Sequence, residues 1–110
     1  MVKKKENKID NFEKALEGKD QRFLLRLYIT GTTPRSVQAI SNIKKICEEY
    51  MDNYELEVID IYQQPDMARE EQIIAVPTLI KKLPQPLRKF IGDLSDTESI
   101  LVGLNLKKKD

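Results

Sequence analysis

Ile73-Ile74-Ala75-Val76-Pro77-Thr78 is the stretch at which a helix-like segment stops and a short apolar strand begins. Because Pro77 has no N–H to give to a sheet, it belongs at the first residue of a strand or on a sheet edge. The trans preference of an X–Pro bond is only about 0.5–1 kcal/mol, so tertiary contacts can fix either isomer. Pro84 and Pro86 follow in the same half of the chain. This half is therefore rich in backbone positions with two accessible isomers.

The composition is that of one soluble globular domain. A chain of 110 residues, with 40% hydrophobic and 34% charged residues, is long enough for a single core. The formal net charge of +1 indicates neither nucleic acid nor an anionic membrane as a partner. No apolar run approaches the roughly 20 residues of a membrane span, and the lysine-rich start lacks the apolar region of a signal peptide. A cytoplasmic location is expected.

Missing residue types argue against an enzyme. The sequence contains no histidine, the commonest general base and a frequent ligand of transition metals. Its single cysteine, Cys47, permits no intrachain disulfide, no Cys-x-x-Cys dithiol and no zinc site of the usual kinds. The four glycines stand singly, so no glycine-rich phosphate loop is present. We expect no catalysis, no metal and no cofactor.

Residues 1–21 predict a basic N-terminal extension. The segment begins with Lys3, Lys4 and Lys5 and then places Ile9, Phe12 and Leu16 at a helical spacing before Gly18. One short amphipathic helix would fit this pattern. A disordered basic arm is the alternative, because an isolated helix of this length is marginally stable.

The next two elements form the start of a β-α-β unit. Arg22–Ile29 is apolar at nearly every position, which predicts a central strand buried on both faces. Thr33 is a good N-cap and Pro34 suits the first helical position. The predicted helix buries one stripe, Val37, Ile40, Ile43, Cys47 and Tyr50, and exposes Arg35, Gln38, Asn42, Lys45 and Glu49. We interpret Cys47 as a small buried hydrophobe on this stripe.

The middle of the chain completes the β-α-β unit and begins the second half. Leu56–Tyr62 predicts a second strand, which a right-handed crossover would make parallel to the first. Pro65 starts a short acidic helix that is predicted to run from Asp66 to Ile74. Its apolar contacts are expected to be Met67, Ile73 and Ile74.

The last third predicts a hairpin and a helix. Thr78–Lys82 and Leu87–Ile91 read as two strands joined by a proline-bearing connection. Ser95 and Glu98 have the spacing of a capping box. The final helix is predicted to bury Ile100, Leu101 and Leu104 and to end at residues that tolerate the left-handed conformation, Gly103 and Asn105. Residues 107–110 are expected to be a solvated tail.

The resulting order β-α-β-α-β-β-α is the thioredoxin order, and it predicts one α/β thioredoxin-like domain over residues 22–106. Such folds carry a cis-proline beside their working surface, at the position of Pro77. A thiol redox protein is therefore one functional hypothesis. Residues 30–33, where the catalytic thiols would sit, carry hydroxyls and a glycine, which cannot perform dithiol exchange.

Several segments in joint order carry a more specific resemblance. They are Leu27–Ser36 (LYITGTTPRS), Val58–Asp60 (VID), Val76–Leu79 (VPTL), Pro84–Ser95 (PQPLRKFIGDLS) and Leu101–Leu104 (LVGL). From about Phe23 to Leu106 the chain resembles the KaiB family of circadian clock proteins.

The resemblance implies a non-enzymatic regulator that binds the hexameric ATPase KaiC in circadian timing or a related timing or stress pathway. It implies KaiA or a sensor histidine kinase as further partners. It also implies fold switching between a homotetrameric ground state, with a different C-terminal half, and a thioredoxin-like monomer that docks on the ATPase. A dimer is a further possibility for self-association. The alternative is a sensor or adaptor domain related to the sensor domain of a clock-linked histidine kinase.

The resemblance also implies roles for particular residues. The resemblance associates fold switching with the proline-rich half and the last helix, at Pro77, Pro84, Pro86, Gly103 and Asn105; the family often has an acid at the position of Asn105. It also implies that Arg88 and Lys89 match a basic pair lining the tetramer.

Each of two surfaces can be interpreted either as a functional site or as ordinary solvent-exposed surface. A docking face for the ATPase is expected on the exposed side of the first helix and the second strand, at Thr33, Arg35, Gln38, Asn42, Glu55 and Glu57. Together with Arg88 and Lys89, the neighbouring Lys81 and Lys82 suggest a basic patch on the hairpin, and solvation of the hairpin explains these four residues equally well.

Overall fold

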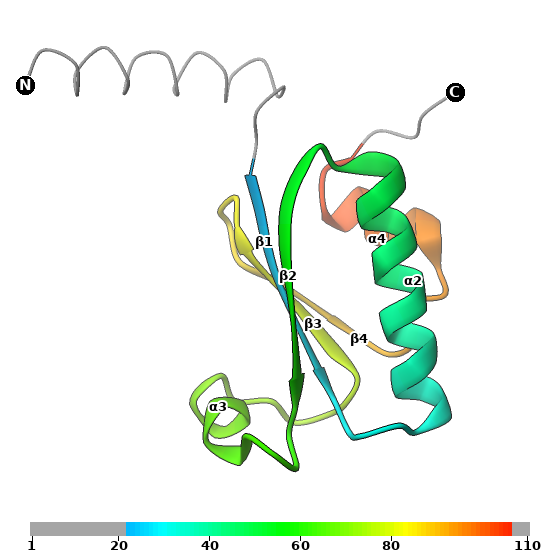
Figure 1. Ribbon diagram of the computed structural model, residues 1–110. Helices are drawn as coiled ribbons and strands as arrows, with labels where there is room; N and C mark the ends of the chain where they lie inside the picture. The colour runs from blue at the N-terminus through cyan, green and yellow to red at the C-terminus, as the bar shows by residue number, and fades with distance from the viewer. Residues whose placement is uncertain (1–21, 107–110) are drawn as a thin grey trace, which may run out of the picture.

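The structure, a computed structural model, describes residues 22–106 in seven elements (Figure 1). These are β1 (Arg22–Ile29), α2 (Pro34–Tyr50), β2 (Asn53–Asp60), α3 (Pro65–Glu70), β3 (Thr78–Leu83), β4 (Arg88–Ile91) and α4 (Thr97–Gly103). The predicted thioredoxin-like order is confirmed. The predictions for the extension 1–21 and the tail 107–110 lie outside the described residues. No helix within residues 22–106 has the length and apolar character needed to cross a membrane.

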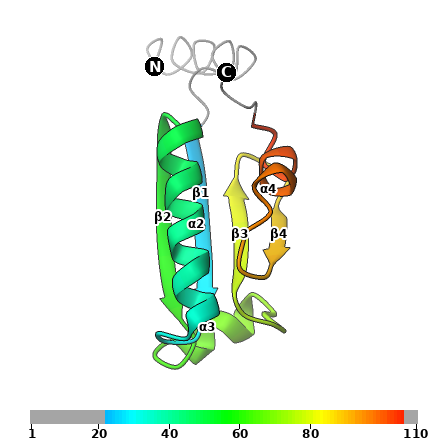
Figure 2. The same ribbon diagram turned by 90° about the vertical axis from the view of Figure 1, so that its right-hand side faces the viewer.

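The sheet has the strand order β2-β1-β3-β4, so β1 is central as predicted. β1 pairs in parallel with β2 and antiparallel with β3, and β3 pairs antiparallel with β4. Helices α2 and α4 cover one side of the sheet, which we call the helical face (Figures 1 and 2). On the other side, the open face, α3 lies against one end only.

Alternation along β1 decides which side chains reach each face. Phe23, Leu25 and Leu27 point to the helical face and belong to the main core, in which Leu25 and Leu27 are fully buried. The residues between them, Leu24 and Arg26, point to the open face. The main core also contains residues from α2, β3 and α4, including Ile43, Cys47, Leu79, Ile100, Leu101 and Leu104. A smaller cluster on the open face contains Tyr28, Ile59 and Ile80, with Met67 and Ile73 packed against it.

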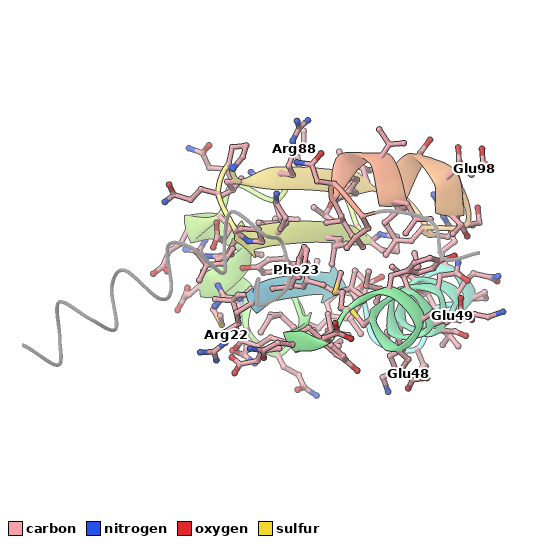
Figure 3. The ribbon with its side chains drawn as sticks, turned by 90° about the horizontal axis from the view of Figure 1, so that it is seen from above. Arg22, Phe23, Glu48, Glu49, Arg88 and Glu98 are labelled. Carbon is pink, nitrogen blue, oxygen red and sulfur yellow. The ribbon has the colours of Figure 1, made fainter. Side chains whose placement is uncertain are left out.

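Helix α2 begins as predicted, and four of the five residues of its predicted stripe contact the core: Ile43 and Cys47 are buried, and Ile40 and Tyr50 are partly buried against it. Thr33 is the N-cap, and its Oγ1 accepts a hydrogen bond from Ser36 N (3.3 Å). Val37, predicted to be buried, is 52% exposed. The buried side chains that the pattern did not predict are Ser36, Ala39 and Ile46. In its first two turns the helix approaches the sheet through the small side chains of Ser36 and Ala39, which hydrophobicity alone does not predict. Figure 3 shows Glu48 and Glu49 on the outer side of α2 and Arg22 on the open side of the sheet.

The second strand and second helix differ from the predicted bounds. β2 runs over Asn53–Asp60, earlier than the predicted Leu56–Tyr62, because it pairs residue by residue with all of β1. Helix α3 ends at Glu70, since Gln72 takes a left-handed conformation (φ 56°) that no helix continues through. Ile73 then packs on the open-face cluster, while Ile74, predicted to be a buried helix contact, is 91% exposed.

Helix α4 is capped one residue later than predicted. Its N-cap is Asp96, whose Oδ1 accepts from Ser99 N (3.2 Å) and whose Oδ2 accepts from Ser99 Oγ (2.8 Å). The capping box of Ser95 and Glu98 is therefore wrong. Ser95 N donates instead to Asp93 Oδ1 (3.0 Å), which fixes the turn before the helix. Hydrogen bonds from Ser95 lower the pKa of the Asp93 carboxyl.

Of the two residues predicted to take the left-handed conformation at the end of α4, Asn105 does so (φ 58°) and Gly103 does not. Gly103 instead allows close packing. Gly103 is the last residue of α4 and lies over Phe90 of β4. A Cβ built at Gly103 would stand 2.3 Å from Phe90 Cε1, far inside van der Waals contact. The α4–β4 contact thus requires a residue without a side chain at this position.

Substituting Gly103 by alanine should destabilise this fold by about 1–3 kcal/mol, because the Phe90 ring must move away from the new methyl group. Urea unfolding followed by circular dichroism would measure the change. In a Phe90→Leu background the cost of Gly103→Ala should fall by about 1 kcal/mol or more, since the ring is gone. An equal cost in both backgrounds would contradict the assigned contact.

Candidate docking surface

Loops gather at the end of the sheet where β1 and β2 finish and β3 begins. Ile61 N donates to Ile29 O (3.0 Å), and Gly92 N donates to Pro77 O (2.9 Å). We call this region, formed by residues 30–33, 61–62 and 71–77, the loop end; it lies at the bottom of Figure 1. Open α/β sheets bind ligands outside the carboxyl ends of their parallel strands. The loop end is therefore the candidate binding region.

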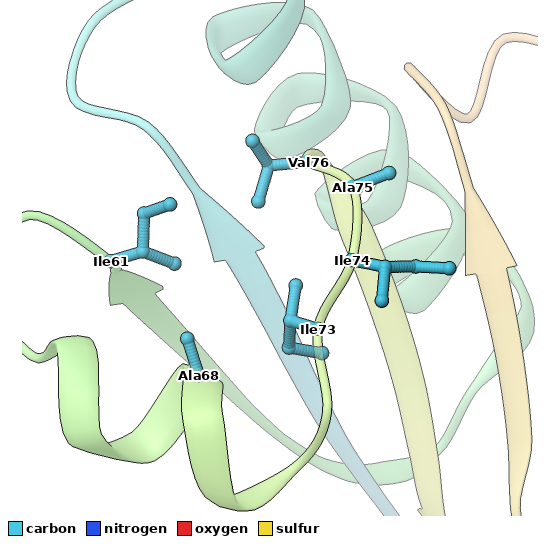
Figure 4. A pocket seen from close by; sticks show the side chains of 6 residues that line it. All are labelled: Ile61, Ala68, Ile73, Ile74, Ala75 and Val76. Carbon is cyan, nitrogen blue, oxygen red and sulfur yellow. The ribbon is translucent and has the colours of Figure 1, made fainter.

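A small apolar hollow of about 120 Å³ opens at the loop end. Figure 4 shows Ile61 and Ala68 on one side of it and Ile73 and Val76 on the other. Ile74 and Ala75 complete its lining, and all six side chains that line it are apolar. Small-molecule sites usually enclose about 300–1,000 Å³ and include a few polar groups. The hollow is suited instead to a single apolar side chain of another protein.

Exposed apolar side chains adjoin this hollow. Ile74 is 91% exposed and Tyr62, the residue after Ile61, is 75% exposed. Sequence reasoning missed this surface because it assigned Ile74 to a helix interior. The available signal was the run of four apolar residues from Ile73 to Val76, which is more than the entry of a single strand can bury.

The loop from Thr30 to Thr33 has hydroxyl groups that serve the start of α2. Thr30 N donates to Ser36 Oγ (3.1 Å), and Thr33 Oγ1 donates to Ser36 Oγ (2.8 Å). Gly31 takes a positive φ of 53°, which the turn between β1 and α2 requires. These contacts make the loop a helix cap.

The four docking residues predicted on α2 have different surroundings. Arg35 and Gln38 are exposed, and Arg35 Nη2 lies close to Gly92, 3.8 Å from a Cβ built there. Asn42 is half-buried, and its Nδ2 donates to Asp93 O (2.7 Å). Thr33 is exposed but caps the helix. Thr33 and Asn42 therefore have structural roles, whereas Arg35 and Gln38 are available for contact.

The two docking residues predicted on β2 lie on the other side of the sheet. Glu55 pairs with Leu24 and Glu57 with Arg26 in the parallel register, which places both on the open face, away from α2. Arg22 Nη2 lies 3.3 Å from Glu55 Oε1, and Arg26 Nη2 lies 3.0 Å from Glu57 Oε1. The six predicted docking residues do not form one continuous face.

The residues associated with fold switching cluster around β3 and α4. The peptide bonds before Pro77, Pro84 and Pro86 are all cis. Pro77 precedes β3, and the other two prolines lie in the connection between β3 and β4. Gly103 and Asn105 lie at the end of α4.

The basic residues of the hairpin are divided between the two faces. In the β3–β4 register, Lys81 lies opposite Arg88, and Lys89 lies opposite Ile80. Lys81 and Arg88 therefore point to one side of the sheet, and Lys89 points to the other. Lys81 is only 1% exposed, and burial together with the charge of Arg88 lowers the pKa of its ammonium group. Lys82 forms an ion pair with Glu71. One continuous basic patch is therefore not present.

Comparison with known proteins identifies the family. Residues 26–106 match the model of the KaiB domain. The chain belongs to the KaiB family. It is 55% identical over 86 residues to circadian clock protein KaiB3 of Synechocystis sp., covering 77% of this chain and 84% of that protein. It is 51% identical over 85 residues to circadian clock oscillator protein KaiB of Microcystis aeruginosa, covering 76% and 82%.

Solved structures place this KaiB domain among thioredoxin-like folds. The N-terminal domain of Synechococcus elongatus SasA is 25% identical, with a TM-score of 0.64, and the match covers 83% of this chain and 90% of that one. Fasciola hepatica thioredoxin has the same TM-score of 0.64 at 15% identity, covering 90% and 94%. The second likeness shows the fold alone.

The loop end of this KaiB domain, residues 30–33, 61–62 and 71–77, contains no cysteine. Cys47 is fully buried in the last turn of α2. Burial, with a smaller effect of Glu48, raises the pKa of the thiol to about 12. Since the thiolate is the reactive form, Cys47 is poorly suited to exchange. Within residues 22–106, no three His, Cys, Asp or Glu side chains are grouped so that they could hold a metal ion.

The native protein should therefore leave Cys47 unmodified by a thiol reagent at about pH 8, because the thiol is both buried and protonated. Absorbance of the released thiol chromophore would measure the reaction. Addition of urea above the unfolding midpoint should expose one reactive thiol per chain. Rapid modification of the folded protein would contradict the buried position.

Replacing Lys81 by methionine should raise the urea midpoint, because it removes a buried cation that faces Arg88 and keeps the side-chain length. Since folding lowers the pKa of Lys81, its contribution should become less unfavourable as the pH rises from about 7 toward about 10. The advantage of Lys81→Met should shrink over that range. The exposed Lys44→Met should change the midpoint little, and an equal effect of both variants would contradict this interpretation.

Proposed function

We propose that this chain is a cytoplasmic, non-enzymatic regulator that binds a hexameric KaiC-type ATPase in circadian timing or a related timing or stress pathway. Membership of the KaiB family supports the kind of partner. The single structural observation that supports protein binding is the apolar hollow at the loop end with the exposed Ile74. Exposed apolar surface of this kind is typical of protein-binding sites.

The proposed contact has an apolar centre and a polar rim, which is the usual anatomy of an interface. Ile74 and Tyr62 would supply the apolar centre. Arg35 and Gln38, exposed on the first turns of α2, would supply the rim on the helical side. Thr33, Asn42, Glu55 and Glu57 stay in the proposal as flanking residues. Their hydrogen bonds and ion pairs would restrain the elements that carry the contact.

The second part of the proposal concerns the state of the free protein. We infer that the chain also populates a homotetramer or dimer with a different C-terminal half, in which Arg88 and Lys89 line the subunit contact. Pro77, Pro84, Pro86, Gly103 and Asn105 would set the balance between the two forms. Two packings of one sequence can interconvert when they differ by a few kcal/mol. A binding form populated at about 1% would weaken the apparent affinity about 100-fold.

Further partners follow from the same proposal. A docked chain would recruit KaiA or displace a sensor histidine kinase. The likeness to the SasA N-terminal domain favours a second candidate function, a monomeric sensor or adaptor domain that keeps one fold. Light scattering after size-exclusion chromatography would separate the two: a tetramer or dimer supports the switching regulator, and a concentration-independent monomer supports the adaptor.

Substituting Ile74 by aspartate should weaken binding to a nucleotide-loaded KaiC-type hexamer about 10-fold or more, because a charge would enter the apolar contact. Surface plasmon resonance or co-sedimentation would measure the affinity. Leu87→Asp is the matched control, since Leu87 is also exposed but lies in the β3–β4 connection. Equal affinities of Ile74→Asp and wild type would exclude the loop end as the contact. If the wild-type chain retains no ATPase, the partner itself is wrong.

A further inference from the structure

Cationic side chains from three strands converge on one residue of the open face, Glu71. Its Oε1 accepts a hydrogen bond from Arg26 Nη1 of β1 (3.3 Å) and pairs with Lys82 Nζ of β3. Its backbone oxygen accepts from Lys89 Nζ of β4 (3.0 Å). The residue that follows helix α3 is thus tied to the central strand and to both strands of the hairpin. We call these four residues the Glu71 junction.

The junction is better sheltered than an ordinary surface ion pair. The side chains of Arg26 and Glu71 are 18% and 19% exposed, and that of Lys82 is 27% exposed. Arg26 is held from a second side, because its Nε and Nη2 donate to Glu57 Oε1 at 3.2 and 3.0 Å. Fully exposed pairs contribute little to stability, since water and salt screen them and two long side chains must be ordered. In the Glu71 junction, Arg26, Glu71 and Lys82 hold one another in place, so forming each further contact orders fewer side chains.

Glu71 lies at the start of the loop-end segment 71–77, three residues before the exposed Ile74. Glu71 N donates to Met67 O (3.1 Å), Gln72 N to Arg69 O (3.1 Å) and Ile73 N to Ala68 O (2.9 Å), which folds the chain back over the end of α3. Gln72 holds a left-handed φ of 56°, a conformation that costs energy for a residue with a side chain. Ile73 then enters the open-face cluster, and Ile74 is left exposed at the hollow.

We propose that Glu71 is a positioning residue for partner docking: its junction with Arg26, Lys82 and Lys89 holds residues 72–76 in the conformation that presents Ile74. The binding part of this inference rests on the proposed function. The part that assigns Glu71 to holding residues 72–76 concerns the isolated protein and does not depend on a partner. An apolar contact would then depend on a charged group that need not touch the partner.

Amide hydrogen exchange of the isolated protein, read by NMR, tests the loop-holding part. In Glu71→Gln the amides of Gln72 and Ile73 should exchange about 10-fold faster, while the amides of α2 keep their wild-type rates. Glu70→Gln is the matched control, because Glu70 is the exposed neighbour on the last turn of α3 and should leave all rates unchanged. Lys82→Gln should give the same pattern as Glu71→Gln with a smaller change. Wild-type rates in Glu71→Gln, or a uniform acceleration that includes α2, would overturn the proposal.

Binding to a nucleotide-loaded KaiC-type hexamer tests the positioning part. Glu71→Gln should weaken the affinity about 5-fold to 10-fold, and Glu70→Gln should match wild type. A loosened loop with unchanged affinity would overturn the positioning role. A wild-type chain that binds no hexamer would contradict the proposed function, and the exchange rates would still decide whether Glu71 holds the loop.

Discussion

Burial of β1 at the centre of the sheet is the constraint on which the rest of this structure depends. The strand pairs along its whole length with β2 and along most of its length with β3, and Leu25 and Leu27 are fully buried against the helices. Because side chains alternate along a strand, this burial also determines the open face, where Arg26 and Tyr28 point. A one-residue slip would move the whole apolar set away from α2 and α4.

The same constraint shapes the candidate docking surface. With β1 and β2 parallel, their ends meet at one edge, and the loops that follow must gather there. In a thioredoxin-like fold this edge can carry thiols. In this KaiB domain it carries a hydroxyl-capped helix start and an apolar hollow. The only cysteine is buried with a pKa of about 12. This edge therefore presents an apolar hollow and no thiol.

Local signals predicted a large part of the fold. The continuous apolar run of Arg22–Ile29 identified the central strand, and the Thr33-Pro34 pair identified the start of α2, because each pattern has few alternative structures. The parallel β1–β2 pair followed from the β-α-β order with its right-handed crossover. The family could be recognised because several of its segments occur in their joint order.

What the sequence did not predict depended on contacts between distant residues. Val37 is exposed because α2 approaches the sheet through Ser36 and Ala39, and a hydrophobic pattern does not count small residues as contacts. The Ser95 cap failed because Asp96 competes for the same role. Glu55 and Glu57 were assigned to the same face as α2 because the register of β2 was unknown. The exposure of Ile74 depends on the left-handed Gln72 and on the Glu71 junction.

An amide NMR titration of the isotopically labelled chain with a nucleotide-loaded KaiC-type hexamer would locate the docking surface residue by residue. Signals of residues 61–62 and 72–76 should weaken first, followed by those of the first turns of α2. Signals at the outer side of α4 should be affected last. Perturbation confined to α4 and β4, or no perturbation at a saturating concentration of hexamer, would contradict the assignment of the loop end as the docking surface.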